Sequence, residues 1–191
     1  MTVSERYTEL KRKVVSRREE FADLTDFIET QTSYLAAPAS TKYHLCHEGG
    51  LLEHSVNVAE TILKLRVTLA PDLDEESCVI VALLHDLGKA GVPGQPQYIE
   101  NLSSEKQQRY GYLPAFPYRF NEELTFLSVP IRSLYLILPY LHLTPEEVQA
   151  IAYHDGQYVP ENRSVAAKEC KLTLLLQYAD NWSGFIIEKE K

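Results

Sequence analysis

The chain has 191 residues and a mass of 21.8 kDa, a length typical of one domain. Hydrophobic residues make up 45% and charged residues 24%, which argues against collagen-like, disordered and membrane-embedded classes. The chain carries 19 Lys and Arg against 27 Asp and Glu, and this net charge of −8 argues against long duplex nucleic acid as a partner. No apolar signal segment or disulfide framework is evident, so we expect a cytoplasmic, non-membrane protein in one domain, residues 1–191.

The spacing of apolar residues predicts an all-α chain interrupted by one small flap. The first helical segment is expected over residues 4–34, with Ser4 as N-cap and one break near Glu20. Its basic cluster, residues 11–18, is typical of a solvated helix face, and phosphate contact is the weaker interpretation. A helix starting near Leu51 and ended by Pro71 follows.

The next helix is apolar on all sides, begins after Asp74 and is expected to stop at Gly88. Residues 95–123 are rich in Tyr and Pro and predict a small β-hairpin or ordered flap, which could stack on a base or simply pack. Further helices are expected over residues 129–140, 144–154 and 164–183, with Thr144 as N-cap and Glu147 completing its capping box.

Polar side chains lie at the edges of three of these apolar helices. His85 and Asp86 end the most apolar helix, and His54 and Asp180 lie beside apolar stripes of two others. An unpaired carboxylate in such a place is costly, and two imidazoles with two carboxylates suit a first-row divalent ion. Alone, His85 and Asp86 could equally be a hydrogen-bonded pair that caps the helix.

Three motifs carry a family resemblance: GGLLEHS at residues 49–55, HDLGK at residues 85–89 and YADN at residues 178–181. Together they resemble the HD-domain superfamily of metal-dependent phosphohydrolases. The resemblance implies an HD-type helical bundle over residues 39–184, to which residues 1–36 add a helical extension. It also implies one divalent ion (Mn, Fe, Co, Ni, Zn or Mg) held by His54, His85, Asp86 and Asp180.

Branches of this superfamily with two metals carry additional histidines, and this sequence departs from them. Val129 and Ile131 stand where that pattern has a histidine and an acid, whereas His154 is kept and is followed by Asp155. One metal is therefore favoured. His154 is expected to contact substrate phosphate or protonate the leaving group, or else to be a histidine stabilised by its helix end.

The resemblance implies hydrolysis of a nucleotide or small phosphate ester or phosphodiester, by water that the ion activates. Asp86 would orient that water, Lys89 and Arg132 would neutralise substrate charge, and His44 would line the pocket. Helix-end and surface ion-pair roles remain open for the two cations. Two alternatives also remain: a nuclease or phosphodiesterase acting on an oligonucleotide end, and a silent module that binds metal or nucleotide. An oligomer is compatible with the sequence.

Overall fold

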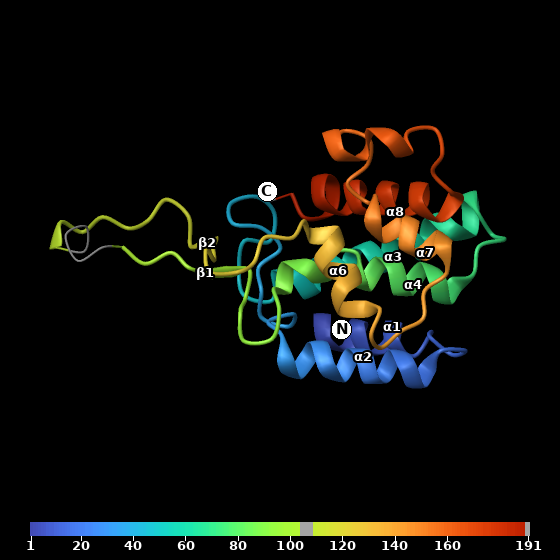
Figure 1. Ribbon diagram of the computed structural model, residues 1–191, viewed down its shortest axis with the longest axis horizontal. Helices are drawn as coiled ribbons and strands as arrows, with labels where there is room; N and C mark the ends of the chain where they lie inside the picture. Colours follow the sequence, from blue (N-terminus) through green and yellow to red (C-terminus); the bar gives the residue numbers. More distant parts are fainter. Residues whose placement is uncertain (104–108, 190–191) are drawn as a thin grey trace.

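The computed structural model describes residues 1–103 and 109–189 and confirms the all-α class (Figure 1). Its α-helices are α1 (Val3–Lys11), α2 (Arg18–Gln31), α3 (Gly50–Leu69), α4 (Glu75–Leu84), α6 (Val129–Ile137), α7 (Pro145–Ala152) and α8 (Lys171–Trp182). Shorter helical turns are the 3₁₀ segments η1 (Leu87–Ala90) and η2 (Pro160–Val165) and the π-helical η3 (Ser183–Ile187). Two strands, β1 (Tyr98–Glu100) and β2 (Tyr118–Phe120), form an antiparallel pair.

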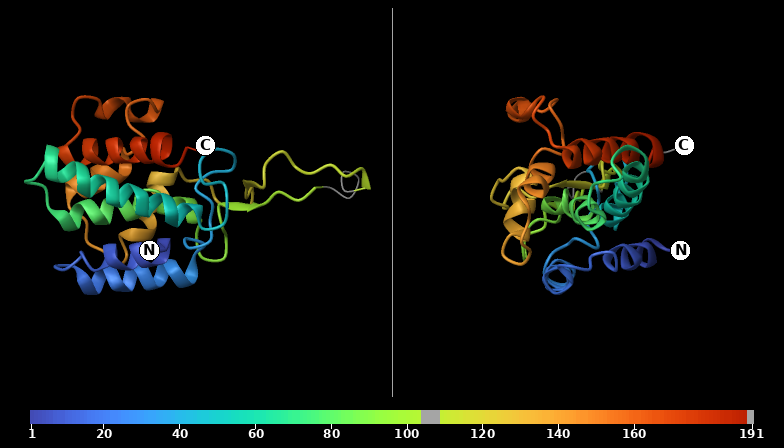
Figure 2. Two further views of the ribbon diagram at one scale, coloured as in Figure 1. Left: turned by 180° about the vertical axis from the view of Figure 1, so that it is seen from behind. Right: turned by 90° about the vertical axis from the view of Figure 1, so that its right-hand side faces the viewer.

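The helix α4 lies at the centre of the bundle. Its residues from Cys78 to Leu84 are at most 1% exposed, as its uniformly apolar sequence predicts. It packs on α3, α7 and α8, while α1 and α2 cover the opposite side of the bundle from α8 (Figures 1 and 2). Asp74 caps α4 as expected, because its carboxylate accepts the N–H of Ser77 at 2.9 Å.

The first helical segment differs from its prediction in two places. Thr2, not Ser4, is the N-cap of α1, in a capping box with Glu5. The break falls between Lys11 and Arg18 and not near Glu20. There the distant carboxylate of Glu76 accepts backbone N–H groups of the connection, a long-range contact that helical periodicity cannot reveal.

The turn after α4 carries His85 and Asp86. The helix α4 ends at Leu84, and Gly88 does not end it as predicted. Residues 87–90 continue as the 3₁₀ turn η1, and the left-handed φ of 81° falls at Gly91. Gly88 is needed for another reason, since a Cβ at this position would lie 2.3 Å from the carbonyl oxygen of Val129 at the start of α6. The backbones of η1 and α6 therefore meet directly.

The Tyr-rich flap forms the predicted hairpin. β1 and β2 pair Tyr98 with Phe120 and Glu100 with Tyr118. The described residues beyond these strands project away from the helical body (Figure 1 and the left view of Figure 2). Stacking of this segment on a substrate base thus gains no support from the arrangement.

The helix predicted over residues 164–183 differs from the structure at both its start and its end. The expected helix over residues 164–183 is two elements, η2 and α8, separated by a turn in which Ala167 has a φ of 63°. η3 extends α8 with a π-helical turn. By contrast, α7 has the predicted capping box of Thr144 and Glu147.

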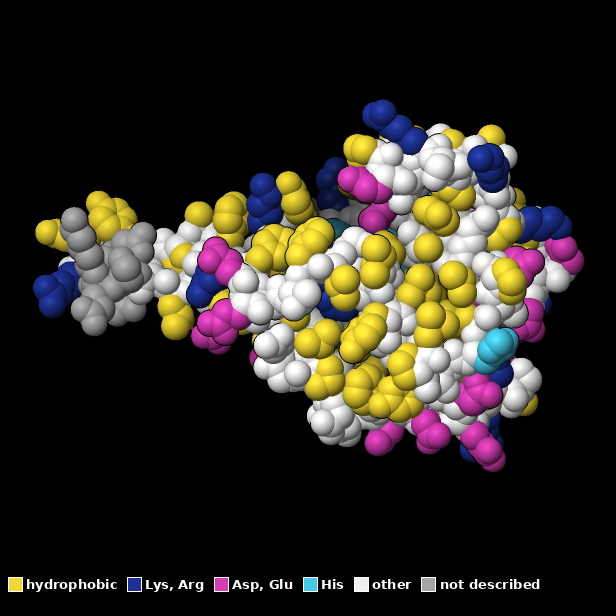
Figure 3. All heavy atoms as spheres, viewed as in Figure 1, with side chains coloured by type: hydrophobic (Ala, Val, Ile, Leu, Met, Phe, Trp, Pro, Cys, Tyr) yellow, Lys and Arg dark blue, Asp and Glu magenta, His cyan; other side chains and the backbone are white. Residues whose placement is uncertain are grey.

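Hydrophobic side chains gather on the face that Figure 3 shows, over α6. On that helix Ile131 is 57% exposed and Tyr135 is 63% exposed. Exposed apolar patches are typical of contact surfaces between proteins, but an oligomer stays a prediction. Among the described residues, no helix is both long enough and apolar enough to cross a membrane.

Candidate metal centre and adjoining cavities

The four side chains expected to hold a metal converge from three parts of the bundle. His54 comes from α3, His85 and Asp86 from the end of α4, and Asp180 from α8. The Nε2 atom of His54 lies 3.1 Å from Oδ1 of Asp180 and 3.6 Å from Oδ2 of Asp86. The Nε2 atom of His85 lies 3.6 Å from Oδ2 of Asp86 and 3.9 Å from Oδ1 of Asp180. Both imidazoles thus face the same two carboxylates.

His85 has a buried nitrogen that the described residues leave without a hydrogen bond. The side chain is fully buried, and its Nδ1 lies 2.9 Å from the carbonyl oxygen of Ala82. Nδ1 therefore carries the proton, because a carbonyl can only accept. Nε2 is left with a lone pair and no partner, which costs about 1–3 kcal/mol in a buried place. Burial lowers the pKa of His85 to about 4, so the ring is neutral and ready to bind a cation.

The two carboxylates are ionised. Burial opposes ionisation of Asp86, but the positive charge of Lys89 outweighs it and holds the pKa of Asp86 well below the ordinary value. Asp180 likewise has a lowered pKa, since the hydrogen bond with His54 outweighs its burial. Burial alone would lower the pKa of His54, but its bonds to Asp180 and Glu188 raise it to about 10. Asp86 and Asp180 therefore both carry negative charge, and the space between them and the two imidazoles favours a cation.

These observations test whether a divalent ion fits. The unpartnered Nε2 of His85 and the Nε2 of His54 each lie 3.1–3.9 Å from an oxygen of both ionised carboxylates. This nitrogen and oxygen donor set suits a first-row divalent cation, which would take the place of the proton on His54. The residues present fit the ion.

A family model of the HD domain matches residues 51–183. The chain belongs to the HD-domain family. A dihydroneopterin 2',3'-cyclic phosphate phosphodiesterase from Methanocaldococcus jannaschii is 33% identical over 86 residues, which cover 42% of this chain and 34% of that protein. This chain therefore spans about a third of the length of that relative. No solved structure matches at a significant level.

His154 joins the centre of this HD domain from the end of α7. Its Nε2 lies 3.4 Å from Oδ1 of Asp86, and its Nδ1 lies 2.8 Å from the carbonyl oxygen of Ile151. Burial would lower the pKa of His154, but the bond to Asp86 outweighs it and raises the pKa to about 9. His85, Asp86 and His154 therefore form a second group with ligand geometry, overlapping the first.

Lys89 and Arg132, the two predicted substrate cations, differ in their surroundings. Lys89 lines the metal cavity, where its Nζ lies 2.5 Å from Oδ2 of Asp86. Arg132 does not line that cavity; it is 3% exposed, and its guanidinium donates to the carbonyl oxygens of Gly88 and Leu127 at 2.9 and 3.0 Å. Arg132 thus joins η1 to the chain before α6, and its contact with substrate stays a prediction.

Two cavities meet at the centre. The metal cavity has a volume of about 240 Å³ and is lined by His44, His54, Asp86, Lys89, His154, Asp155, Asp180, Asn181, Gly184 and Phe185. An adjoining cavity of about 570 Å³ is lined by Lys42, Tyr43, His44, Gly184, Phe185, Glu188 and Lys189. They share His44, Gly184 and Phe185, so the predicted pocket residue His44 lies at their junction.

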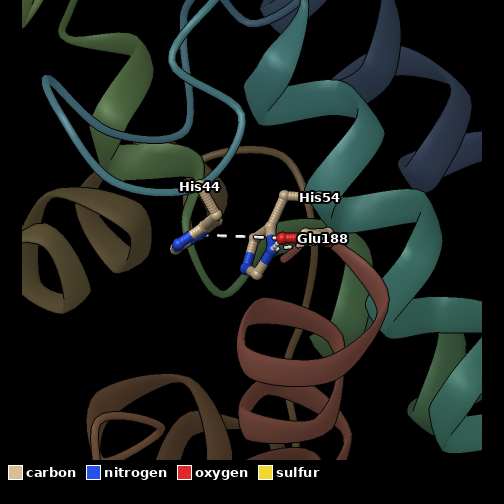
Figure 4. Close-up of side chains that lie close together, drawn as sticks. All are labelled: His44, His54 and Glu188. Carbon is tan, nitrogen blue, oxygen red and sulfur yellow. Dashed lines mark hydrogen bonds and ion pairs between the residues drawn. The ribbon is translucent and has the colours of Figure 1, made fainter. Parts of the chain in front are cut away.

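Sequence reasoning missed Glu188, which follows η3. Its side chain is 1% exposed and contacts Nδ1 of His54, as Figure 4 shows. In the sequence it stands near the chain end beside Lys189, outside the family motifs, and no local pattern marked it.

Proposed function

We propose that this HD domain is a metal-dependent phosphohydrolase that acts on a nucleotide or a small phosphate ester or phosphodiester. The observation that carries the proposal is the buried, unpartnered Nε2 of His85, which faces Asp86 and Asp180 beside a cationic Lys89. His54, His85, Asp86 and Asp180 would hold one divalent ion from the series Mn, Fe, Co, Ni, Zn and Mg. Family membership and the named activity of the relative support this reading.

A bound divalent ion lowers the pKa of coordinated water and polarises a phosphoryl oxygen. Around it, Asp86 and Asp180 each have a second carboxylate oxygen that can accept a hydrogen bond from the attacking water and orient it. Lys89 supplies positive charge beside Asp86, where a phosphoryl group would enter. His154 is placed next to Asp86 and would contact phosphate or donate a proton to the leaving oxygen.

The two cavities support a small substrate with a planar ring. The inner cavity has room for a phosphoryl group, and the adjoining one has room for the remainder. Tyr43 and Phe185 line the adjoining cavity and are 69% and 71% exposed, so their rings are available for stacking. The relative is named for a cyclic phosphate that carries a pterin ring, which fits this division.

The basic cluster of residues 11–18 gives no support to an oligonucleotide substrate. Lys11 pairs with Glu29 at 2.7 Å, Lys13 with Glu75 at 2.5 Å, and Arg17 with two buried glutamates. Charges compensated in this way are poorly available to a phosphate backbone.

The test combines metal analysis with a substrate panel. The purified protein is examined for bound metals by mass spectrometry, reloaded with Mn²⁺, Co²⁺ or Zn²⁺, and assayed on nucleoside 2',3'- and 3',5'-cyclic phosphates and nucleotides. His85→Ala should abolish both binding and hydrolysis, whereas His142→Ala, an exposed histidine between α6 and α7, should change neither. Metal bound without hydrolysis of any ester would sink the enzyme proposal, and absence of binding would sink the metal assignment.

A further inference from the structure

Glu188 is buried behind a predicted metal ligand. Its Oε2 and Oε1 lie 2.9 and 3.1 Å from Nδ1 of His54, so both carboxylate oxygens are within hydrogen-bond distance of that nitrogen. Figure 4 shows the two side chains in contact. The side-chain amide of Asn57 donates to Oε1 at 2.9 Å. The carboxylate is thus fixed from a second direction and cannot swing away from the imidazole freely.

The contact determines which nitrogen of His54 faces the metal cavity. A carboxylate only accepts hydrogen bonds, so Nδ1 must carry the proton that it receives. The proton at Nδ1 leaves Nε2 as the ligand nitrogen, and Nε2 lies 3.1 Å from Asp180 at the centre of the site. The same bond holds the ring plane, because rotation about the Cβ–Cγ bond would separate Nδ1 from Glu188.

His54 differs in this respect from the other two histidines of the centre. The Nδ1 atoms of His85 and His154 face backbone carbonyls, of Ala82 and Ile151, which are neutral acceptors. A carboxylate in that position adds negative charge behind the ring and makes Nε2 a stronger electron donor. Among the three histidines, His54 is therefore the one whose affinity for the ion depends most on a side chain that is not itself a predicted ligand, namely Glu188.

The group of His44, His54 and Glu188 also has the spacing of a small metal site, but the chemistry favours positioning. An ion at Nδ1 of His54 would displace the proton, and the ring could then serve the main site at Nε2 only as an imidazolate. His44 is farther away, with Nε2 3.8 Å from Oε2 of Glu188. A neutral His54 that donates from Nδ1 to Glu188 and binds the ion from Nε2 uses both of its ring nitrogens.

The backbone fixes Glu188 in turn. The N–H of Glu188 donates to the carbonyl oxygen of Ser183 at 2.9 Å, which closes the π-helical turn η3. The hydroxyl of Ser183 lies 3.4 Å from that of Thr61 on α3, the helix that carries His54. The end of the chain is thereby tied to the ligand helix.

We propose that Glu188 is a positioning residue, which sets the tautomer and orientation of His54 so that Nε2 binds the metal ion. This role rests on the proposed metal-dependent function. Glu188 also lines the adjoining cavity, but this role acts through His54 and gives Glu188 no part in proton transfer.

The test compares Glu188→Gln with Glu53→Gln, a variant on the same helix as His54 that removes the same charge. The side chain of Glu53 lies 3.6 Å from Nε2 of His47, and among the described residues no hydrogen bond or ion pair joins it to a predicted ligand. Co²⁺ affinity is measured by calorimetry, and the exchangeable Nδ1 proton of His54 is followed by proton NMR of the Co²⁺-loaded protein. Glu188→Gln should weaken Co²⁺ binding about 10- to 100-fold and broaden or remove that proton signal. Glu53→Gln should change neither.

Two results would overturn the proposal. One is unchanged Co²⁺ affinity and an unchanged proton signal in a folded Glu188→Gln; the other is a second Co²⁺ equivalent in the wild type that Glu188→Gln abolishes while the first remains tight. If Glu188→Gln does not fold, Asn57→Ala must give a smaller loss of the same sign, because it removes one hydrogen bond to the carboxylate. Arg6→Lys is its control, since Arg6 donates to the other end of the Asn57 amide and does not bond to Glu188 in the described residues. Binding without hydrolysis leaves the positioning role intact and refutes only the enzyme proposal; an ion that does not bind refutes both.

Discussion

Replacing Glu76 with glutamine tests how the connection between α1 and α2 is held to the HD domain. Glu76 lies in the first turn of α4 and is 6% exposed. Its carboxylate accepts the N–H groups of Val15 and Ser16, both at 2.7 Å, the hydroxyl of Ser16 at 2.8 Å and Nε of Arg17 at 2.9 Å. We expect this cluster to be one of the larger polar contributions to stability.

The pKa of Glu76 gives the magnitude. Burial would raise this pKa, but the hydrogen bonds of Arg17 and Ser16 outweigh it and lower it from 4.5 to about 2. Because a shift of one pKa unit corresponds to about 1.4 kcal/mol, the lowered pKa of Glu76 contributes about 3 kcal/mol to the free energy of unfolding at neutral pH. The sign follows from the lowered pKa: the contribution is complete above the unfolded value near 4.5 and is lost as the pH falls toward 2.

Urea unfolding followed by circular dichroism measures this contribution between pH 7 and pH 3. Glu76→Gln should lower the free energy of unfolding by about 3 kcal/mol at pH 7, and the difference from the wild type should shrink steadily below about pH 4.5. Glu75→Gln is the control, because the side chain of Glu75 is 44% exposed and its ion pair with Lys13 lies at the surface; this variant should cost less than about 1 kcal/mol. A Glu76→Gln effect that equals the control, or that does not vary with pH, would refute the reasoning.

Two further predictions concern the turn that carries the centre. Gly88→Ala should destabilise the fold by about 1–3 kcal/mol in thermal unfolding, because its Cβ would meet the Val129 carbonyl. In the control Gly94→Ala the Cβ meets nothing within 4 Å, so this variant should cost only the strain of its positive φ. Equal costs of the two variants would contradict the packing argument. Lys89→Met should leave Mn²⁺ affinity equal or tighter, since a competing cation leaves Asp86, yet lower kcat/KM by about 100-fold. Calorimetry and steady-state kinetics check this, and an unchanged kcat/KM would contradict it.

Local chemistry made part of the fold predictable. The N-cap residues Asp74 and Thr144 were identified because side-chain capping depends on neighbours three residues away. The burial of α4 followed from a run of apolar residues with no polar face. His54, His85, Asp86 and Asp180 were selected by their places at helix edges and by family resemblance, and the structure brings them together, although their role as ligands remains a proposal.

Other features depend on contacts that no local pattern contains. Arg132 reads as a surface cation in the sequence, but it is buried because the carbonyls of Gly88 and Leu127 turn toward it. The apparent helix over residues 164–183 has a helical composition throughout, yet residues 166–170 separate η2 from α8, and Ala167 among them has a left-handed φ of 63°. The break after α1 is set by Glu76, about 60 residues away in the sequence.

Glu188 shows how backbone phase decides whether a side chain reaches a site. It follows Asp180 by eight residues, and in a regular α-helix with about 3.6 residues per turn this separation turns the side chain about 80° away from that of Asp180. The π-helical turn η3 adds a residue to one turn, which rotates the following chain back by about 100° and brings Glu188 to the same side. An α-helical extrapolation of α8 therefore places Glu188 off the site, whereas the π turn delivers its carboxylate to Nδ1 of His54. The same reasoning fixes the spacing, since one residue added or removed between Asp180 and Glu188 would again point the carboxylate away from His54.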